Sequence, residues 1–173
     1  MMVLAPLAQL EHLAAPWQSV FSNSKVISTT VAGAHVFAMF VGGGFAIAAD
    51  RSTLRALRGD LETRARQLLE LRHVHRPVLI WIAVLFVSGV MLAASDVKTF
   101  ATSPTFWVKM GLVLLLVVNG AVLTKTEQSL GNGGTTTGTD EQRLWVRLRA
   151  SSWCSLFLWS ATLVAGVILQ NAS

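Results

Sequence analysis

Residues 29–49 read TTVAGAHVFAMFVGGGFAIAA, a run without lysine, arginine, aspartate or glutamate. An α-helix needs about 20 predominantly apolar residues to cross the hydrocarbon of a bilayer, and this run has that length. Its single ionisable side chain is His35, and the glycines Gly42, Gly43 and Gly44 follow in its second half. The run therefore predicts a transmembrane helix with one imidazole inside it.

The chain as a whole has a membrane-like composition. Of its 173 residues, 53% are hydrophobic and 13% are charged, whereas soluble domains average about 25% charged residues. The formal net charge is +5, but most of this charge flanks apolar runs, where membrane topology explains it, so we expect no nucleic-acid partner. Cys154 is the only cysteine, which excludes an intramolecular disulfide, a CxxC redox pair and a CxxCH haem attachment.

Three further apolar runs predict a bundle of four transmembrane helices, so the expected fold is all-α and integral to the membrane. We expect one domain with spans at about residues 29–49, 77–95, 105–124 and 150–170, each antiparallel to its neighbour in the chain. Residues 1–28 carry leucines at a spacing of three to four residues. This spacing predicts an amphipathic helix on the membrane surface.

Two of the connecting segments have a distinctive composition. Residues 51–76 hold seven arginines and an intermittent apolar face, which predict two amphipathic helical pieces against the inner membrane face, separated at Gly59 and Asp60. Pro77 then stands in the first turn of the second span, where proline is tolerated. Residues 126–141 are rich in glycine and threonine and predict a flexible inner loop.

The distribution of basic residues predicts the orientation. Eleven of the fourteen lysines and arginines lie in the segments that follow the first and third spans. Because basic loops stay on the cytoplasmic side, we expect a multi-pass protein of the bacterial inner membrane with both termini on the outer, periplasmic side. The N-terminal segment lacks the basic region of a signal peptide, and we expect it to be retained.

His35 is the first candidate for a functional residue, because an ionisable group inside a span is a functional hypothesis by default. It lies about 9 Å into the first span, at 1.5 Å per residue. The alternatives are a ligand of haem, chlorophyll or a metal, a contact to a quinone, or an imidazole bonded to a neighbouring helix. Met91 and Met110 are predicted at a similar depth, so His35, Met91 and Met110 form a candidate set for a haem iron or Cu(I). His73 and His75 are predicted about 20 Å away, too far to share a haem with His35.

Two other polar residues lie inside the predicted spans. Lys109 is one turn into the third span and is predicted to extend outward, toward Asp96, and Asn119 is predicted to hydrogen-bond between helices. The glycine run predicts a close approach of another helix, a lipid or a flat cofactor. No nucleophile–base pair, paired carboxylates or zinc-ligand spacing occurs in the sequence, so we expect neither enzymatic activity nor a metal centre built from such a cluster.

Two segments carry a resemblance to a known class. AHVFAMFVGGGFAIAADRSTLRAL resembles the first span of a class of small bacterial four-span membrane proteins that is a domain of unknown function. SPTFWVKMGLVLLLVVNGAVL is similar to the third span of that class, with Phe106, Lys109 and Asn119 at the matching positions. In size and layout the class is loosely similar to cytochrome b561-like and CopD-like membrane proteins. This resemblance implies a four-helix fold and a role of His35 as a ligand, although a second histidine at matching depth is absent here.

These observations leave three functions open. The first is a non-catalytic accessory subunit of a larger respiratory or photosynthetic membrane complex, with the lipid bilayer and other membrane subunits as partners. The second is an electron-transfer protein that binds haem b or chlorophyll through His35. The opposing expectation is that the protein binds no cofactor. The third is a small copper transporter, against which stands the lack of an acid inside any predicted span, since cation pathways commonly use one.

Overall fold

The computed structural model describes residues 4–131 and 138–172, without the side chains of residues 4–7, 72, 75, 138, 139 and 170–172. Within these residues the structure consists of six α-helices and contains no strand. Four helical segments are long and apolar enough to cross a membrane: Lys25–Ala56, Arg76–Ser95, Pro104–Gly131 and Asp140–Leu169. The predicted all-α bundle with four spans is confirmed, and the protein has the character of a multi-pass membrane protein.

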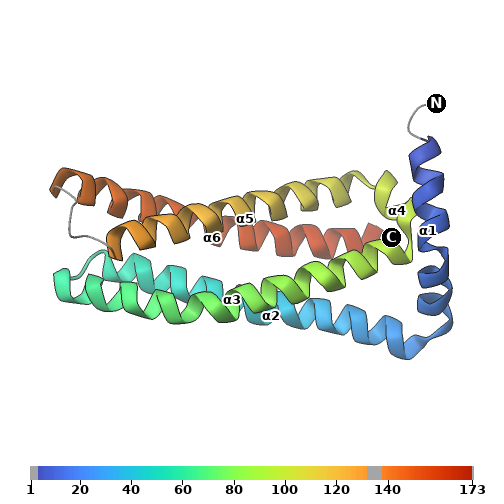
Figure 1. Cartoon of the computed structure of the whole chain (residues 1–173), viewed down its shortest axis with the longest axis horizontal. Helices are drawn as coiled ribbons and strands as arrows, with labels where there is room; N and C mark the ends of the chain where they lie inside the picture. Colours follow the sequence, from blue (N-terminus) through green and yellow to red (C-terminus); the bar gives the residue numbers. More distant parts are fainter. Residues whose placement is uncertain (1–3, 132–137, 173) are drawn as a thin grey trace.

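The first two spans are parts of longer helices than the sequence predicts. Helix α2 runs over Lys25–Ala56 and α3 over Leu61–Ser95, which are 32 and 35 residues, against the roughly 20 that a span requires. The predicted break between them is confirmed, because the Asp60 side chain caps α3 by accepting a hydrogen bond from the Thr63 backbone N–H at 2.9 Å. The arginine-rich segment therefore continues the two spans and does not form separate pieces (Figure 1).

Pro77 lies inside α3 and does not start a helix, which differs from the prediction. Proline removes one backbone hydrogen bond and its ring crowds the preceding turn. The helix nevertheless continues, because α3 packs along α2 on both sides of the proline, with Leu71 buried before it and Ser88 buried after it. Tertiary packing thus outweighs the local preference of the proline.

The second pair of spans also extends beyond the predicted limits. Helix α5 runs over Pro104–Gly131 and α6 over Gly138–Ala172. The first residues of the predicted flexible loop are therefore helical, up to Gly131, and its middle, residues 132–137, lies outside the described residues. The predicted turn before α5 contains a short helix, α4, over Val97–Thr102.

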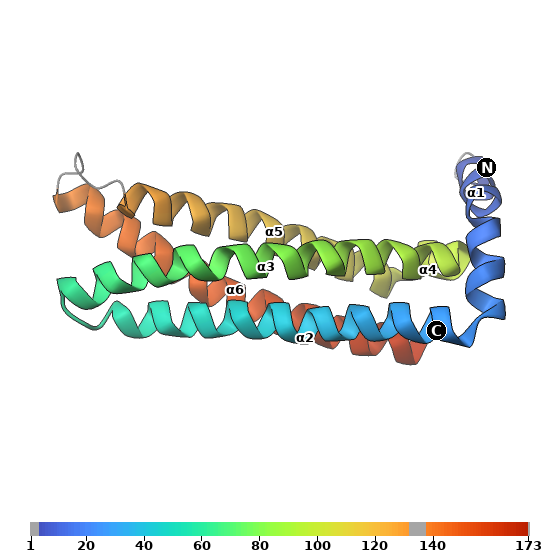
Figure 2. The same cartoon turned by 60° about the horizontal axis from the view of Figure 1, so that its bottom comes forward.

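The helices form two antiparallel hairpins, α2–α3 and α5–α6, which meet mainly through α2 and α6. Figures 1 and 2 show these four helices side by side, with the α2–α3 turn, the end of α5 and the start of α6 at one end of the bundle. Helix α4 and both ends of the chain lie at the opposite end. Helices α3 and α5 share few contacts, so each keeps a large outward face.

Helix α1, over Leu4–Asn23, lies across the end of the bundle that carries α4 (Figure 2). Its attachment is specific, because the indole N–H of Trp17 donates a hydrogen bond of 2.8 Å to the Met91 backbone carbonyl of α3. Trp17 also contacts the ring of Phe21, with 5.7 Å between ring centroids. Its position agrees with a helix that rests on the membrane surface.

The glycine run in α2 marks the places where two other helices come closest. A Cβ atom on Gly42 would lie 2.9 Å from Trp81 Cβ of α3, and one on Gly43 would lie 3.1 Å from the Trp159 ring of α6. Gly44 faces open space. The sequence predicts another helix, a lipid or a flat cofactor beside this run. At Gly42 and Gly43 the neighbour is a helix of the same chain, α3 and α6 respectively.

Candidate functional site

The imidazole of His35 is half-buried between α2 and α3. Its Nδ1 atom lies 3.0 Å from the Ser88 hydroxyl oxygen, and that hydroxyl lies 2.6 Å from the Val84 carbonyl oxygen. A carbonyl cannot donate, so the single Ser88 hydroxyl proton goes to Val84 and His35 Nδ1 must carry the proton shared with Ser88. The Nε2 atom of a neutral His35 is consequently the nitrogen with a free lone pair, the arrangement that ligating histidines have.

Small residues and one cation surround this imidazole. A Cβ on Gly89 would lie 3.3 Å from His35 Cε1, and one on Gly166 would lie 3.3 Å from Lys109 Nζ. Lys109 is within electrostatic range of His35. The lysine thus extends toward α6, and the predicted contact with Asp96 is wrong, since Asp96 instead caps α4 through the Thr99 N–H at 3.1 Å.

The structure places the two candidate methionines differently. Met91 lies three residues after Ser88 and therefore on nearly the same face of α3, one turn further toward the α4 end, where its backbone carbonyl accepts the Trp17 bond. Met110 is 37% exposed and is turned by about 100° around α5 from Lys109. The described contacts of His35 are to Ser88, the Leu85 backbone, Gly89 and Lys109, so a ligand set with either sulfur stays a prediction.

The ammonium group beside His35 bears on the kind of ligand that this position favours. A lysine within electrostatic range of His35 opposes the binding of a metal cation there and favours a neutral or anionic ligand. His73 lies on the arginine-rich part of α3, exposed, with Nδ1 at 2.9 Å from the Leu69 carbonyl, and the side chain of His75 lies outside the described residues. No group of three or more potential metal-ligating His, Cys, Asp or Glu side chains occurs among the described residues.

A second polar cluster lies at the arginine-rich end of the bundle, and it contains two acids that lie just outside the predicted spans. Asp50 of α2 is 5% exposed and lies beside the Ser152 and Ser155 hydroxyls of α6. Glu127 of α5 is 8% exposed and lies within electrostatic range of Asp50. Asp50 and Glu127 lie just beyond the predicted spans 29–49 and 105–124, and the packing of α2 and α5 on α6 brings them within electrostatic range of each other.

Some polar atoms of this cluster lack hydrogen bonds. Ser152 is fully buried, and its hydroxyl makes no hydrogen bond of good geometry although it lies against the Asp50 carboxylate. Glu127 Oε1 is likewise buried without a partner among the described residues. Buried polar groups are normally hydrogen-bonded, so these two atoms distinguish the cluster from the nearby Thr53–Gln67 pair, which is joined at 3.2 Å.

A periodic pattern in α6 explains why the acids are buried. Side chains no more than 8% exposed recur at alternating steps of three and four residues, the period of a helix seam that faces other helices: Trp145, Leu148, Ser152, Ser155, Trp159 and Thr162. The centre of this seam is made of hydroxyl-bearing residues. The spacing of these residues is visible in the sequence and could have indicated a polar interior. Asp50 was not included in it, because the predicted first span ends before the first charged residue.

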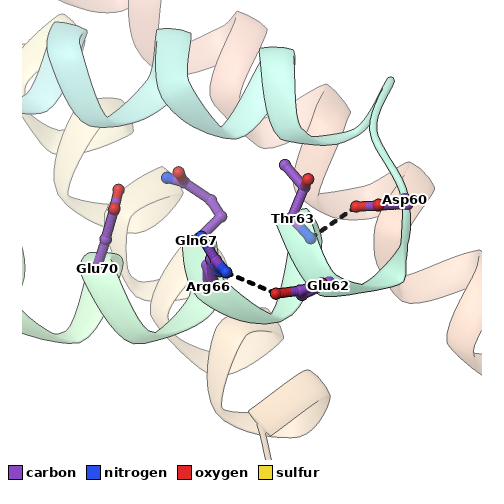
Figure 3. Close-up of a pocket in the computed structure, with 6 residues that line it drawn as sticks. All are labelled: Asp60, Glu62, Thr63, Arg66, Gln67 and Glu70. Atoms are coloured by element: carbon purple, nitrogen blue, oxygen red, sulfur yellow. Dashed lines mark hydrogen bonds and ion pairs between the residues drawn. The ribbon is translucent and has the colours of Figure 1, made fainter.

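A hollow in the described surface lies elsewhere. It measures about 330 Å³ and lies along the start of α3, lined by six residues: Asp60, Glu62, Thr63, Arg66, Gln67 and Glu70 (Figure 3). Its Glu62–Arg66 ion pair of 2.6 Å is about three-quarters exposed. Exposed ion pairs of this kind contribute little to the stability of a fold. Figure 3 shows the Gln67 side chain extending from α3 toward α2. The hollow is a solvated helix surface.

Fold and interior together define a multi-pass helical membrane bundle with two internal clusters of ionisable residues, one around His35 and one around Asp50. No protein-family model, curated protein or solved structure matches the chain. The likeness to a bacterial four-span class and to cytochrome b561-like proteins stays a prediction.

Proposed function

We propose that this protein is a non-catalytic, four-span subunit of a larger membrane complex in the bacterial inner membrane. The observation that carries this proposal is the position of α5, whose buried residues in the described structure are only Thr126 and Glu127, both near its inner end. A further anchor is the pair Asn119–Ser151, joined at 3.0 Å and 2.9 Å. Along the outer two-thirds of α5, the face turned away from α6 is therefore left for lipid or for another membrane protein.

Photo-crosslinking in native membranes tests this proposal. A photoreactive amino acid at Leu114, which is 64% exposed on α5, is expected to form an adduct with a second membrane protein. The same probe at Phe40, 78% exposed on α2, provides a matched control for random collisions. Adducts with lipid alone at Leu114 would contradict a subunit role.

The respiratory or photosynthetic nature of the complex belongs to the same proposal. It rests on the resemblance in layout to cytochrome b561-like proteins, and on no residue contact. Identification of the crosslinked partner by mass spectrometry tests it directly, because a partner without redox cofactors would argue against this part.

A second candidate function is electron transfer through a haem or chlorophyll on His35. The free lone pair on His35 Nε2, which follows from the Ser88–Val84 hydrogen bond, favours it. Absorption spectra of the gently purified protein, oxidised and dithionite-reduced, are expected to show haem or chlorophyll bands that disappear in His35→Ala. Ser88→Ala is the matched variant, which keeps the ligand and weakens only its orientation. Bands that persist in His35→Ala would contradict this role.

The proposed orientation places both termini outside. It is supported by the arginine distribution and by the two chain ends lying at the same end of the bundle (Figure 1). In a Cys154→Ser background, a membrane-impermeant maleimide added to whole cells with a permeabilised outer membrane is expected to label Thr99→Cys and to leave Gly59→Cys unlabelled. The reverse pattern would overturn the orientation.

A further inference from the structure

We propose that the Asp50 carboxylate, the Ser152 and Ser155 hydroxyls and the neighbouring Glu127 form a binding site for one exchangeable monovalent cation, a proton or a sodium ion. The site lies along α6, which packs against both α2 and α5, at the arginine-rich end of the bundle. This inference goes beyond the subunit role and does not rest on it, since a cation can bind whether or not a partner protein is present.

The first step of the argument is the burial of two like charges. Asp50 and Glu127 are 5% and 8% exposed, and Glu127 lies within the electrostatic range of Asp50. Removing a carboxylate from water is costly, and a second carboxylate nearby raises that cost because the two repel each other. The arrangement becomes favourable when a cation neutralises one of the charges.

The second step is the unsatisfied hydroxyl. Ser152 is 0% exposed and lies against Asp50, yet its oxygen makes no hydrogen bond of good geometry. Carboxylate and hydroxyl oxygens are hard ligands, of the kind that prefer hard cations. Glu127 Oε1, also buried without a described partner, adds a second unused acceptor. Among the described residues no third His, Cys, Asp or Glu joins these two carboxylates, so the site carries at most two negative charges.

The third step concerns the cations that the protein itself supplies at this end. The guanidinium of Arg64 lies over the Trp145 ring at 5.4 Å and donates to the Leu57 carbonyl. The remaining basic residues of α2, α5 and α6 near this level are exposed: Arg51, Arg55, Lys125, Arg147 and Arg149. On α3, Gln67 is neutral and bonded to Thr53, and the side chains of Arg72 and His75 lie outside the described part.

The described ion pairs involve other acids. They join Glu62 to Arg66 and Asp140 to Arg143, so within residues with described side chains neither Asp50 nor Glu127 has a basic partner within 4.0 Å. The charge of this cluster is therefore open to an external cation, and the experiment must also detect neutralisation by Arg72 or His75.

Labelling with dicyclohexylcarbodiimide tests the proposal. This apolar reagent adds a protonated carboxyl across its C=N bond, and it reaches carboxyls in dry surroundings. With the full-length protein in liposomes, we expect an adduct on Asp50 or Glu127, located by peptide mass spectrometry, while exposed Asp60 and Glu62 stay unmodified. The labelling is expected to fall as the pH rises.

Two arms distinguish the two cations. Replacing choline chloride by sodium chloride at constant pH and ionic strength is expected to suppress labelling if sodium occupies the site, and to leave it unchanged if only a proton does. Ser152→Ala, a small change in a buried position, is expected to weaken sodium protection or to shift the pH profile. Asp50→Asn and Glu127→Gln identify which carboxyl reacts, with circular dichroism as the check on folding.

Two results would overturn the inference. One is the absence of an adduct on both carboxyls at every pH in protein shown to be folded, which would mean that Arg72, His75 or another internal group holds the acids ionised. The other is labelling that responds neither to pH nor to sodium, which would mean a permanently protonated, structural acid pair. Neither result would bear on the crosslinking at Leu114.

Discussion

Gly42 of α2 and Trp81 of α3 are in such close contact that a Cβ atom on the glycine would lie 2.9 Å from Trp81 Cβ. One residue further along α2, a Cβ on Gly43 would lie 3.1 Å from the ring of Trp159 on α6. The two hairpins are thus joined where α2 passes between two tryptophans. Small residues at such contacts let helix backbones approach, and packing rather than the hydrophobic effect holds helices together in lipid.

Gly42→Ala is therefore expected to destabilise the bundle. The added methyl meets a Cβ atom, which cannot move without moving the α3 backbone, and overpacking of this kind costs about 1–3 kcal/mol. The measurement is the free energy of unfolding in detergent, from an SDS titration followed by circular dichroism.

Gly44→Ala is the matched control for this substitution. Nothing lies within 4 Å of a Cβ at Gly44, and alanine is a better helix former than glycine by about 1 kcal/mol. Equal unfolding free energies for Gly42→Ala and Gly44→Ala would contradict the close contact with Trp81.

The sequence was sufficient to predict the four spans, because apolar length and basic flanks report on the membrane directly. It also indicated the break at Asp60, because a helix cap is a local feature, and an interhelical role for Asn119, because a polar side chain inside a span needs a partner. The helix ends were less predictable. Local rules place a start at Pro77, whereas packing against α2 carries α3 through it.

The interior chemistry was predicted only in part. His35 was recognisable because it stands alone in an apolar run, but its partner Ser88 depends on the rotation of α3 relative to α2. The proximity of Asp50 and Glu127 depends on how α2 and α5 each pack on α6, and no spacing along one helix encodes it. The relative positions of the packed helices therefore decide which residues meet in both clusters.

Asn119 and Ser151 form the reciprocal hydrogen bonds that hold α5 to α6, with the amide donating to the Ser151 carbonyl and the Ser151 hydroxyl donating to Asn119 Oδ1. Interhelical hydrogen bonds in membranes contribute about 0.6 kcal/mol on average and up to about 1.7 kcal/mol. A double-mutant cycle of Asn119→Ala and Ser151→Ala is expected to give a coupling energy in this range. Additive effects would show that the side-chain bond contributes nothing.

Trp17 controls the docking of α1 through its bond to the Met91 carbonyl. Trp17→Phe keeps an aromatic ring and removes the donor, so a net loss of about 1 kcal/mol is expected. Amide hydrogen exchange in α1 should become about fivefold faster, since 1.4 kcal/mol corresponds to a factor of ten. Trp107→Phe is the control, because it removes an indole donor that bonds the Ala101 carbonyl of α4 and not α3. It should leave the Trp17–Met91 bond, and so the exchange in α1, unchanged.

Asp60 gives the α2–α3 turn a dependence on pH. Hydrogen bonds from Thr63, through its hydroxyl and its backbone N–H, hold the pKa of the Asp60 carboxyl below its ordinary value of 3.8. A carboxyl with a lowered pKa stabilises the folded state above its unfolded pKa, and this contribution is lost as the pH falls through the folded pKa. Acidification below about pH 4 is therefore expected to fray the start of α3.

Asp60→Asn keeps a capping oxygen that does not titrate, and should remove the pH dependence while preserving the cap. Hydrogen exchange of the Thr63 amide at neutral and acidic pH, corrected for intrinsic exchange rates, measures this effect, and identical pH profiles for the parent protein and Asp60→Asn would refute it.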